Sequence, residues 1–78
     1  MREAIELLVK ALVDNPDAVE VVEQPGEARG VVRIDIHVAP EDTGKVIGRQ
    51  GKIANAIRTV AKAAAVRLDR RVVVDILD

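Results

Sequence analysis

The sequence of 78 residues contains no phenylalanine, tyrosine or tryptophan, and this absence excludes several ways of binding nucleic acid. RNA-recognition motifs stack bases on aromatic side chains of a sheet, and cold-shock and other OB-type modules do the same. A chain without aromatic residues has no side chains for either mode. A nucleic-acid site in this protein must therefore rely on backbone groups, basic side chains and aliphatic contacts.

Cysteine and serine are also absent, and histidine occurs only once. Without cysteine there is no disulfide framework and no thiolate chemistry, which suits a reducing compartment. His37 lies on the polar side of an alternating segment and has no serine or cysteine nucleophile to activate. A lone imidazole and scattered carboxylates do not form a metal-ligand cluster. We therefore expect a protein that is not an enzyme and has no cofactor, metal or small-molecule substrate.

Long apolar runs are missing from the sequence too. The first twenty residues carry Arg2, Glu3, Glu6, Lys10 and Asp14 among their apolar positions, which fits neither a signal peptide nor a membrane span. At this length the chain has room for one hydrophobic core. We expect one small domain over residues 1–78, soluble and cytoplasmic.

What the sequence does contain is a G-x-x-G turn, formed by Gly48 and Gly51, between two apolar helical stretches. Glycine lets the backbone approach a ligand closely and can adopt positive φ angles. The N–H groups that open the next helix are donors at the positive end of its dipole. Arg49 and Lys52 add positive charge at the same place. The segment therefore favours contact with a phosphate backbone.

Two other glycine-loop motifs do not fit the same segment. A Walker-type phosphate loop needs a glycine where Val46 stands, and a serine or threonine where Ile53 follows Lys52. A dinucleotide-binding loop also needs a glycine at position 46. The remaining alternative is a plain helix-to-helix turn without a ligand.

The net charge of −1 conceals two parts of opposite sign. Residues 1–43 contain four basic and ten acidic side chains, whereas residues 44–71 contain eight basic side chains and one acid. The positive potential therefore centres on the G-x-x-G segment, and the rest of the surface repels an anionic polymer. For Arg67, Arg70 and Arg71 the simpler explanation is a solvated helix face.

Hydrophobic periodicity predicts three helices and three strands. The predicted elements are a helix over residues 5–12 ended by Asn15-Pro16, a strand over 19–22 ended before Pro25-Gly26, a strand over 32–38, a short helix from Pro40 to Ile47, a helix after Gly51 and a strand over 71–77. Glu41 and Asp42 suit the start of the short helix as caps. The last two strands, separated by two helices, should pair in parallel through a right-handed crossover.

The helix after the turn is predicted to have two distinct faces. At 100° per residue its apolar side chains form one arc, which we expect to pack on the sheet. This arc comprises Ile53, Ile57, Val60, Ala61, Ala64 and Leu68. The polar side chains Asn55, Arg58, Thr59 and Lys62 lie close to Lys52 on the other face. Because the polar face is continuous with the turn, part of it can follow a bound strand.

The segment Val46-Ile47-Gly48-Arg49-Gln50-Gly51-Lys52-Ile53 resembles the K-homology (KH) signature V-I-G-x-x-G-x-x-I, with Ala54 at the last apolar position. Together with residues 56–60 and the chain length, it is similar to the KhpA family of small bacterial single-KH RNA-binding proteins. The likeness covers nearly the whole chain. The predicted element order is that of a type II KH domain, an α+β fold with a three-stranded sheet backed by three helices.

A KH groove holds about four unpaired nucleotides between the helix-turn-helix and a strand edge, with aliphatic side chains under the bases. Ile47 and Ile53 are candidates for this apolar floor, although both also fit the core. The predicted RNA-binding residues are Lys45, Ile47, Gly48, Arg49, Gln50, Gly51, Lys52, Asn55 and Arg58.

The resemblance implies a single-stranded RNA-binding protein that acts as a post-transcriptional regulator or RNA chaperone. The alternative is a protein-interaction subunit that forms homodimers or pairs with a KhpB-like KH-domain protein and binds nucleic acid weakly. Leu7, Val73 and Leu77 lie off the predicted apolar faces and are candidates for such an interface. Single-stranded DNA would use the same groove, and the 2′-hydroxyl distinguishes the two nucleic acids.

Overall fold

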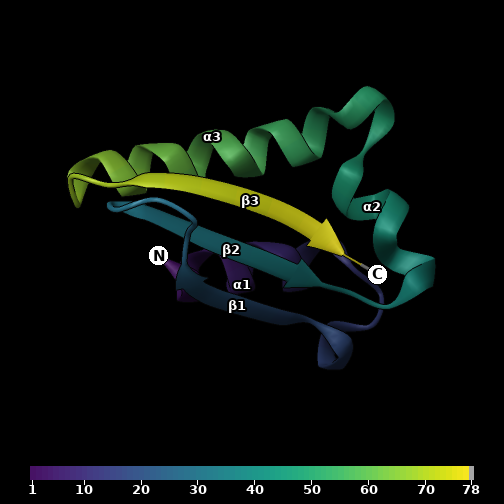
Figure 1. Ribbon diagram of the computed structural model, residues 1–78. Coiled ribbons are helices and arrows are strands. Elements are labelled where there is room, and N and C mark those ends of the chain that lie inside the picture. Colours follow the sequence, from purple (N-terminus) through teal and green to yellow (C-terminus); the bar gives the residue numbers. More distant parts are fainter. Residues whose placement is uncertain (78) are drawn as a thin grey trace.

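The computed structural model describes residues 1–77 and shows three helices and a three-stranded sheet (Figure 1). The elements are α1 (Arg2–Leu12), β1 (Glu20–Pro25), β2 (Val31–His37), α2 (Thr43–Ile47), α3 (Lys52–Arg67) and β3 (Arg71–Leu77). Short 3₁₀ turns occupy Pro16–Ala18, Pro40–Asp42 and Arg49–Gly51. The predicted order of helix, strand, strand, helix, helix, strand is therefore confirmed.

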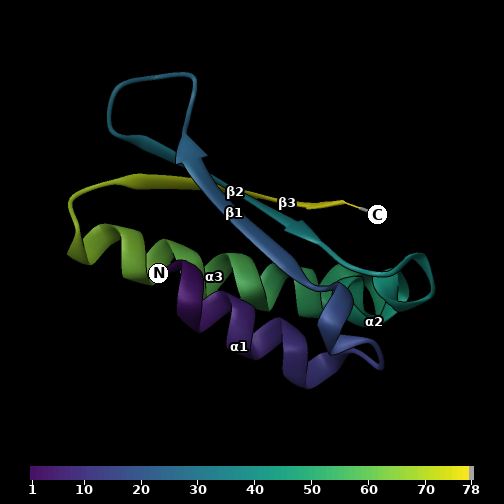
Figure 2. The same ribbon diagram turned by 90° about the horizontal axis from the view of Figure 1, so that it is seen from below.

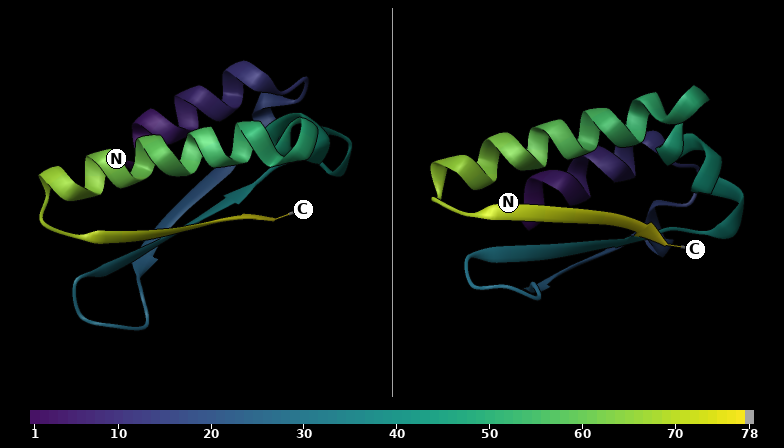
Figure 3. Two further views of the ribbon diagram at one scale, coloured as in Figure 1. Left: turned by 90° about the horizontal axis from the view of Figure 1, so that it is seen from above. Right: turned by 45° about the horizontal axis from the view of Figure 1, so that its top comes forward.

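The sheet has the strand order β1-β2-β3, with β1 antiparallel and β3 parallel to β2. In the parallel pair, Ile34 lies beside Val74 and Ile36 beside Ile76. Figures 2 and 3 show α1 and α3 side by side over one face of the sheet, while no helix of residues 1–77 covers the other face. Because β3 is the last strand in the order, its outer edge has no neighbouring strand and lies beside α3.

The core lies between the sheet and the helices and consists of aliphatic side chains. From β2 and the residue after it, Val32, Ile34, Ile36 and Val38 are buried, as their alternation in the sequence predicts. The helices, the other strands and Val19, the residue before β1, complete the core; the side chains from the helices and strands are Ile5, Val9, Val21, Val46, Ile57, Ala61 and Val74. Because the chain has no aromatic rings, branched aliphatic side chains fill most of the core.

The predicted buried face of α3 is partly wrong. Val60 and Leu68 are 50% and 58% exposed, whereas Ala54 and Ala65 are buried. The buried stripe lies roughly 50° further round the helix than the predicted arc, because alanines rather than valine face the sheet. Leu68 follows the last residue of the helix, where the chain already turns toward β3.

The first strand also differs from its prediction at both ends. It begins at Glu20 rather than Val19, and it continues through Pro25, which pairs with Val32. A proline is tolerated there because β1 is an edge strand and Pro25 is its last residue. The backbone N–H of Gly26 then donates to the carbonyl of Val31 at 2.7 Å, which closes the hairpin.

Candidate nucleic-acid interface

Gly48 ends α2 in a backbone conformation that belongs to glycine. Its φ of 76° and ψ of 173° lie in a region that residues with a side chain almost never adopt. A Cβ atom added to Gly48 would also lie 2.6 Å from Cγ1 of Ile53, in the first turn of α3. The turn therefore packs directly against the next helix, and only glycine fits at this position.

The rest of the turn is left-handed over two consecutive residues. Gln50 has a φ of 57° and Gly51 a φ of 75°, and the N–H of Gly51 donates to the carbonyl of Gly48 at 3.2 Å. Arg49 and Gln50 are exposed between the two glycines. The left-handed conformation of Gln50 was not expected, because glutamine carries no sequence signal for it. The turn thus presents two polar side chains to solvent.

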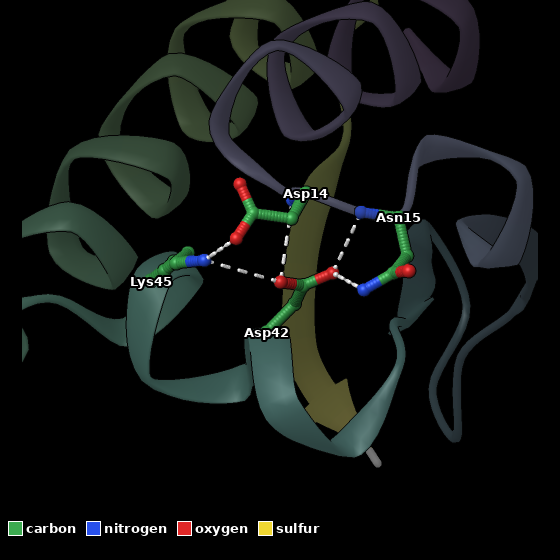
Figure 4. A network of polar contacts seen from close by, with 4 residues as sticks. All are labelled: Asp14, Asn15, Asp42 and Lys45. Carbon is green, nitrogen blue, oxygen red and sulfur yellow. Dashed lines mark hydrogen bonds and ion pairs between the residues drawn. The ribbon is translucent and has the colours of Figure 1, made fainter.

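Asp42 fixes the start of the helix-turn-helix, but not as the predicted cap. Its buried carboxylate accepts hydrogen bonds from the backbone N–H groups of Asp14 and Asn15, at 3.2 and 3.0 Å, and from Nδ2 of Asn15 at 3.0 Å (Figure 4). The carboxylate makes no capping bond to α2. It instead ties the segment before α2 to the chain that leaves α1.

The charge of Asp42 is retained despite its burial. Desolvation is the largest single influence and raises the pKa of the carboxyl. The hydrogen bonds from Asn15 and Asp14 and the positive charge of Lys45, 3.6 Å away, together outweigh desolvation, so the pKa is lowered from its ordinary value of 3.8. The link between α1 and α2 is therefore a buried, ionised one.

The ammonium group of Lys45 takes part in this link rather than facing the turn. It pairs with the carboxylates of Asp14 and Asp42 (Figure 4). The hydrogen bond to Asp14 is the largest influence and raises the pKa of Lys45, and together with the charges of both carboxylates it outweighs the opposing effect of desolvation. Contact between Lys45 and RNA stays a prediction, and it would require this pair to open.

Arg58 lies where α3 meets the free edge of β3. Its Nε donates to the backbone carbonyl of Val74 at 3.3 Å, and one terminal nitrogen donates to Oδ1 of Asn55 at 3.4 Å. Asn55 is in turn next to Gly51, since a Cβ on that glycine would approach Nδ2 of Asn55 to 4.0 Å. The predicted residues 51, 55 and 58 therefore form one continuous polar path from the turn to β3.

A depression continues this path between α3 and β3. It is lined by Arg58 and Lys62 from the helix and by Val72, Val73, Val74 and Asp75 from the strand. Lys62 was not among the predicted binding residues, although its position four residues after Arg58 places it on the same helix face. The strand side chains give the depression an aliphatic wall beside the two cations.

Ile47 and Ile53, the two predicted floor residues, have different surroundings. Ile47 is 38% exposed at the end of α2, so it is not a core residue. Ile53 is half-buried and packs against the core. Of the two, Ile47 offers more aliphatic surface beside the turn.

Ion pairing separates the basic side chains of the protein into two groups. Among the cations outside the turn and α3, Arg2, Lys10, Arg33 and Lys45 pair with carboxylates, whereas Arg29, Arg70 and Arg71 make no ion pair within residues 1–77. Within residues 1–77, those of the turn and α3 make no ion pair: Arg49, Lys52, Arg58, Lys62 and Arg67. The positive charge around the turn is therefore not neutralised by the protein itself.

Two other kinds of site were sought in the same part of the chain. No three histidine, cysteine, aspartate or glutamate side chains among residues 1–77 come together as metal ligands. None of the helices over this range has the length and apolar character needed to cross a membrane.

A three-stranded sheet with helices on one face and a G-x-x-G turn between two of them defines a KH domain. Residues 2–76 match the family described as KhpA/KhpB, KH domain. The chain therefore belongs to the KhpA/KhpB family of KH-domain proteins.

Similar proteins cover the same length. The chain is 56% identical to RNA-binding protein KhpA of Caldanaerobacter subterraneus subsp. tengcongensis, over 99% of this chain and 100% of the relative. It is 54% identical to RNA-binding protein KhpA of Clostridium acetobutylicum over the same shares, and 45% identical to that of Aquifex aeolicus, over 100% of this chain and 96% of the relative. This family is one of RNA-binding KH proteins and not an enzyme family.

Proposed function

We propose that the protein binds single-stranded RNA through the G-x-x-G turn and the adjoining groove between α3 and β3. The observation that carries the proposal is the group of cations at the turn and along α3, none of which forms an ion pair within residues 1–77. The names of the similar proteins support RNA as the ligand. The absence of aromatic side chains favours a KH groove over base stacking on a sheet.

Each part of the site has a distinct role in this proposal. Gly48 and Gly51 let the backbone approach the phosphates, and Arg49 and Lys52 supply the charge. Gln50 donates a further hydrogen bond from the tip of the turn. Asn55 and Arg58 continue the contact toward the edge of β3, where unpaired bases lie. The exposed side chain of Ile47 contacts a base from below.

The proposed biological role follows from binding without catalysis. The protein acts in the cytoplasm as a post-transcriptional regulator or RNA chaperone. It carries out no reaction of its own, since the groove offers cations, an amide, the carboxylate of Asp75 and aliphatic side chains but no nucleophile for a base to activate.

A second candidate function is that of a protein-interaction subunit, which pairs with itself or with a KhpB-like protein. The exposed aliphatic side chains favour it, because Leu7 and Val66 are 73% and 74% exposed, and Val73 and Leu77 are exposed as well. Single exposed aliphatics are common on soluble domains, so this observation has less weight. The two functions differ in whether they need the turn.

The loop variant Arg49→Asp/Gln50→Asp tests this difference. It places two negative charges where the phosphates pass, and aspartate tolerates the left-handed backbone of position 50 better than most residues. Acidic residues just before α3 also suit its dipole, so the change in stability should be about 0.5 kcal/mol or less. The control Arg2→Asp/Ala4→Asp makes the same change in charge on the exposed first turn of α1.

Fluorescence titrations of labelled single-stranded RNA give the result. The loop variant should keep its melting temperature and any protein partner but lose most of its RNA affinity, while the control keeps it. The parent should show a log–log salt slope of roughly −2 to −3, and a duplex or DNA strand of equal length should compete less well than RNA. RNA binding by the loop variant as tight as that of the parent would make the interaction subunit the better account.

A further inference from the structure

The groove beside Arg58 does not end at Lys62. The depression that Arg58 and Lys62 line shares Lys62, Val72 and Val73 with a second depression, which extends to Val66, Arg70 and Arg71. Figure 3 shows α3 and β3 running along one another over this whole length, from the G-x-x-G turn to the turn that joins them. The groove therefore connects two opposite ends of the helix.

A group of arginines stands at the far end of this groove. Three arginines line one depression there: Arg29 of the β1–β2 hairpin, Arg70 of the α3–β3 turn and Arg71, the first residue of β3. The two loops are joined there, because the backbone N–H of Arg71 donates to the carbonyl of Gly30 at 2.9 Å. We call these three residues the far arginine cluster.

No carboxylate among residues 1–77 forms an ion pair with the far arginine cluster. Among the same residues, Asp69 is the only acidic one that lines the depression. Glu23 and Glu27 line a neighbouring depression on the hairpin side, whereas the second depression of the groove is lined by Lys62, Arg70 and Arg71 and, within residues 1–77, by no acidic residue. An anion is therefore attracted on the groove side of the cluster. Arginine binds phosphate through paired N–H donors, which suits a nucleic-acid backbone.

Aliphatic surface connects the cluster to the G-x-x-G turn. Val66 and Val73, which line the second depression, are 74% and 47% exposed. A strand that follows the groove can therefore place bases against aliphatic side chains while its phosphates meet Lys62 and then Arg70 and Arg71. An acidic protein would match the charge, but it has no need of a groove continuous with the turn.

We propose that the far arginine cluster is a second phosphate-binding site for the same RNA strand. This inference rests on the proposed function of the turn. The 16 residues of α3 span about 24 Å at 1.5 Å per residue. A stacked strand that rises about 3.4 Å per nucleotide covers this distance with about seven nucleotides. RNA longer than the four nucleotides held near the turn thus gains contacts at the cluster.

Two RNA lengths and one charge reversal test the proposal. Arg70→Glu/Arg71→Glu is compared with the parent on a tetramer and a decamer of one uridine repeat. A decamer offers about seven overlapping tetramer positions, so a groove limited to four nucleotides should bind the decamer only about sevenfold more tightly than the tetramer. The parent should show a larger ratio of decamer to tetramer affinity than this. The variant should bind the tetramer like the parent, bind the decamer about tenfold more weakly, and show a decamer salt slope smaller by about 1.4.

The controls keep each outcome decisive. Arg2→Glu/Lys10→Glu makes the same change in charge on α1, outside these depressions, and should leave the decamer advantage intact. The variant Arg70→Gln/Arg71→Gln removes the two charges without reversing them and should lose part of the decamer advantage. It provides the same test if the charge-reversal variant does not fold. An equal loss for both RNA lengths, or no loss for the decamer, would overturn the second site. Tetramer binding by Arg49→Asp/Gln50→Asp at parental affinity would instead overturn the proposed function of the turn.

Discussion

Gly48 lies directly against Ile53, because a Cβ atom on the glycine would come within 2.6 Å of the isoleucine Cγ1. The first glycine of the turn is therefore required by packing as well as by its backbone angles. Gly51 faces open space, with nothing nearer than Nδ2 of Asn55 at 4.0 Å. The two glycines of the motif thus have different physical reasons to be there.

Replacing Gly48 by alanine should destabilise the protein by about 1–3 kcal/mol, because alanine disfavours this backbone conformation and its methyl group overlaps Ile53. Gly44, inside α2, has no atom within 4 Å of the same added Cβ. Gly44→Ala is the matched control and should stabilise the protein by about 0.5–1 kcal/mol. Urea unfolding measures both. Equal effects of the two substitutions would contradict the packing of Gly48 on Ile53.

The observed orientation of α3 predicts a large loss of stability for one aliphatic residue of the helix and a small loss for another. Ile57→Ala removes a buried side chain, 1% exposed, and should cost about 2–5 kcal/mol. Val60→Ala changes a side chain that is half exposed and should cost less than about 1 kcal/mol. Thermal or urea unfolding compares them. A loss for Val60→Ala as large as that for Ile57→Ala would favour the face predicted from the sequence instead.

The buried carboxylate of Asp42 makes stability depend on pH in a defined direction. Its pKa is lowered in the folded protein, so its contribution is present above the unfolded value of 3.8 and is lost as pH falls through the lower folded value. Asp42→Asn removes the charge and should destabilise the protein at neutral pH. The difference in unfolding free energy between parent and variant should be constant above about pH 5 and shrink below pH 3.8. A difference that is the same at every pH would mean that folding does not lower the pKa of Asp42.

The sheet could be predicted from the sequence because each strand has a local pattern of alternating or β-branched apolar residues. Alternation identified Val32 to Val38 as a strand with one buried face, and the bounds of β3, Arg71–Leu77, matched the prediction. Two helices between β2 and β3 were enough to predict their parallel pairing. The strand patterns depend on near neighbours along the chain, and the parallel pairing follows from the order of the elements.

The errors came from contacts between distant parts of the chain. Asp42 hydrogen-bonds to residues 27 and 28 positions away, so its local place before α2 suggested a cap. The pairing of Lys45 with Asp14 has the same origin. On α3, size misled the prediction, since alanines let the helix lie close to the sheet while Val60 points outward. The left-handed backbone of Gln50 could not be predicted, because glutamine has no preference for that conformation.

The most direct test of the account is to follow the backbone amide resonances of the labelled protein while a single-stranded RNA tetramer is added. The largest shifts should occur at Gly48, Gly51 and Lys52, followed by Asn55 and Arg58. Residues 2–12 of α1 should stay nearly unchanged. The largest shifts in β1 or on the helix-free face of the sheet, with the amides of the turn unmoved, would contradict RNA binding at the G-x-x-G turn.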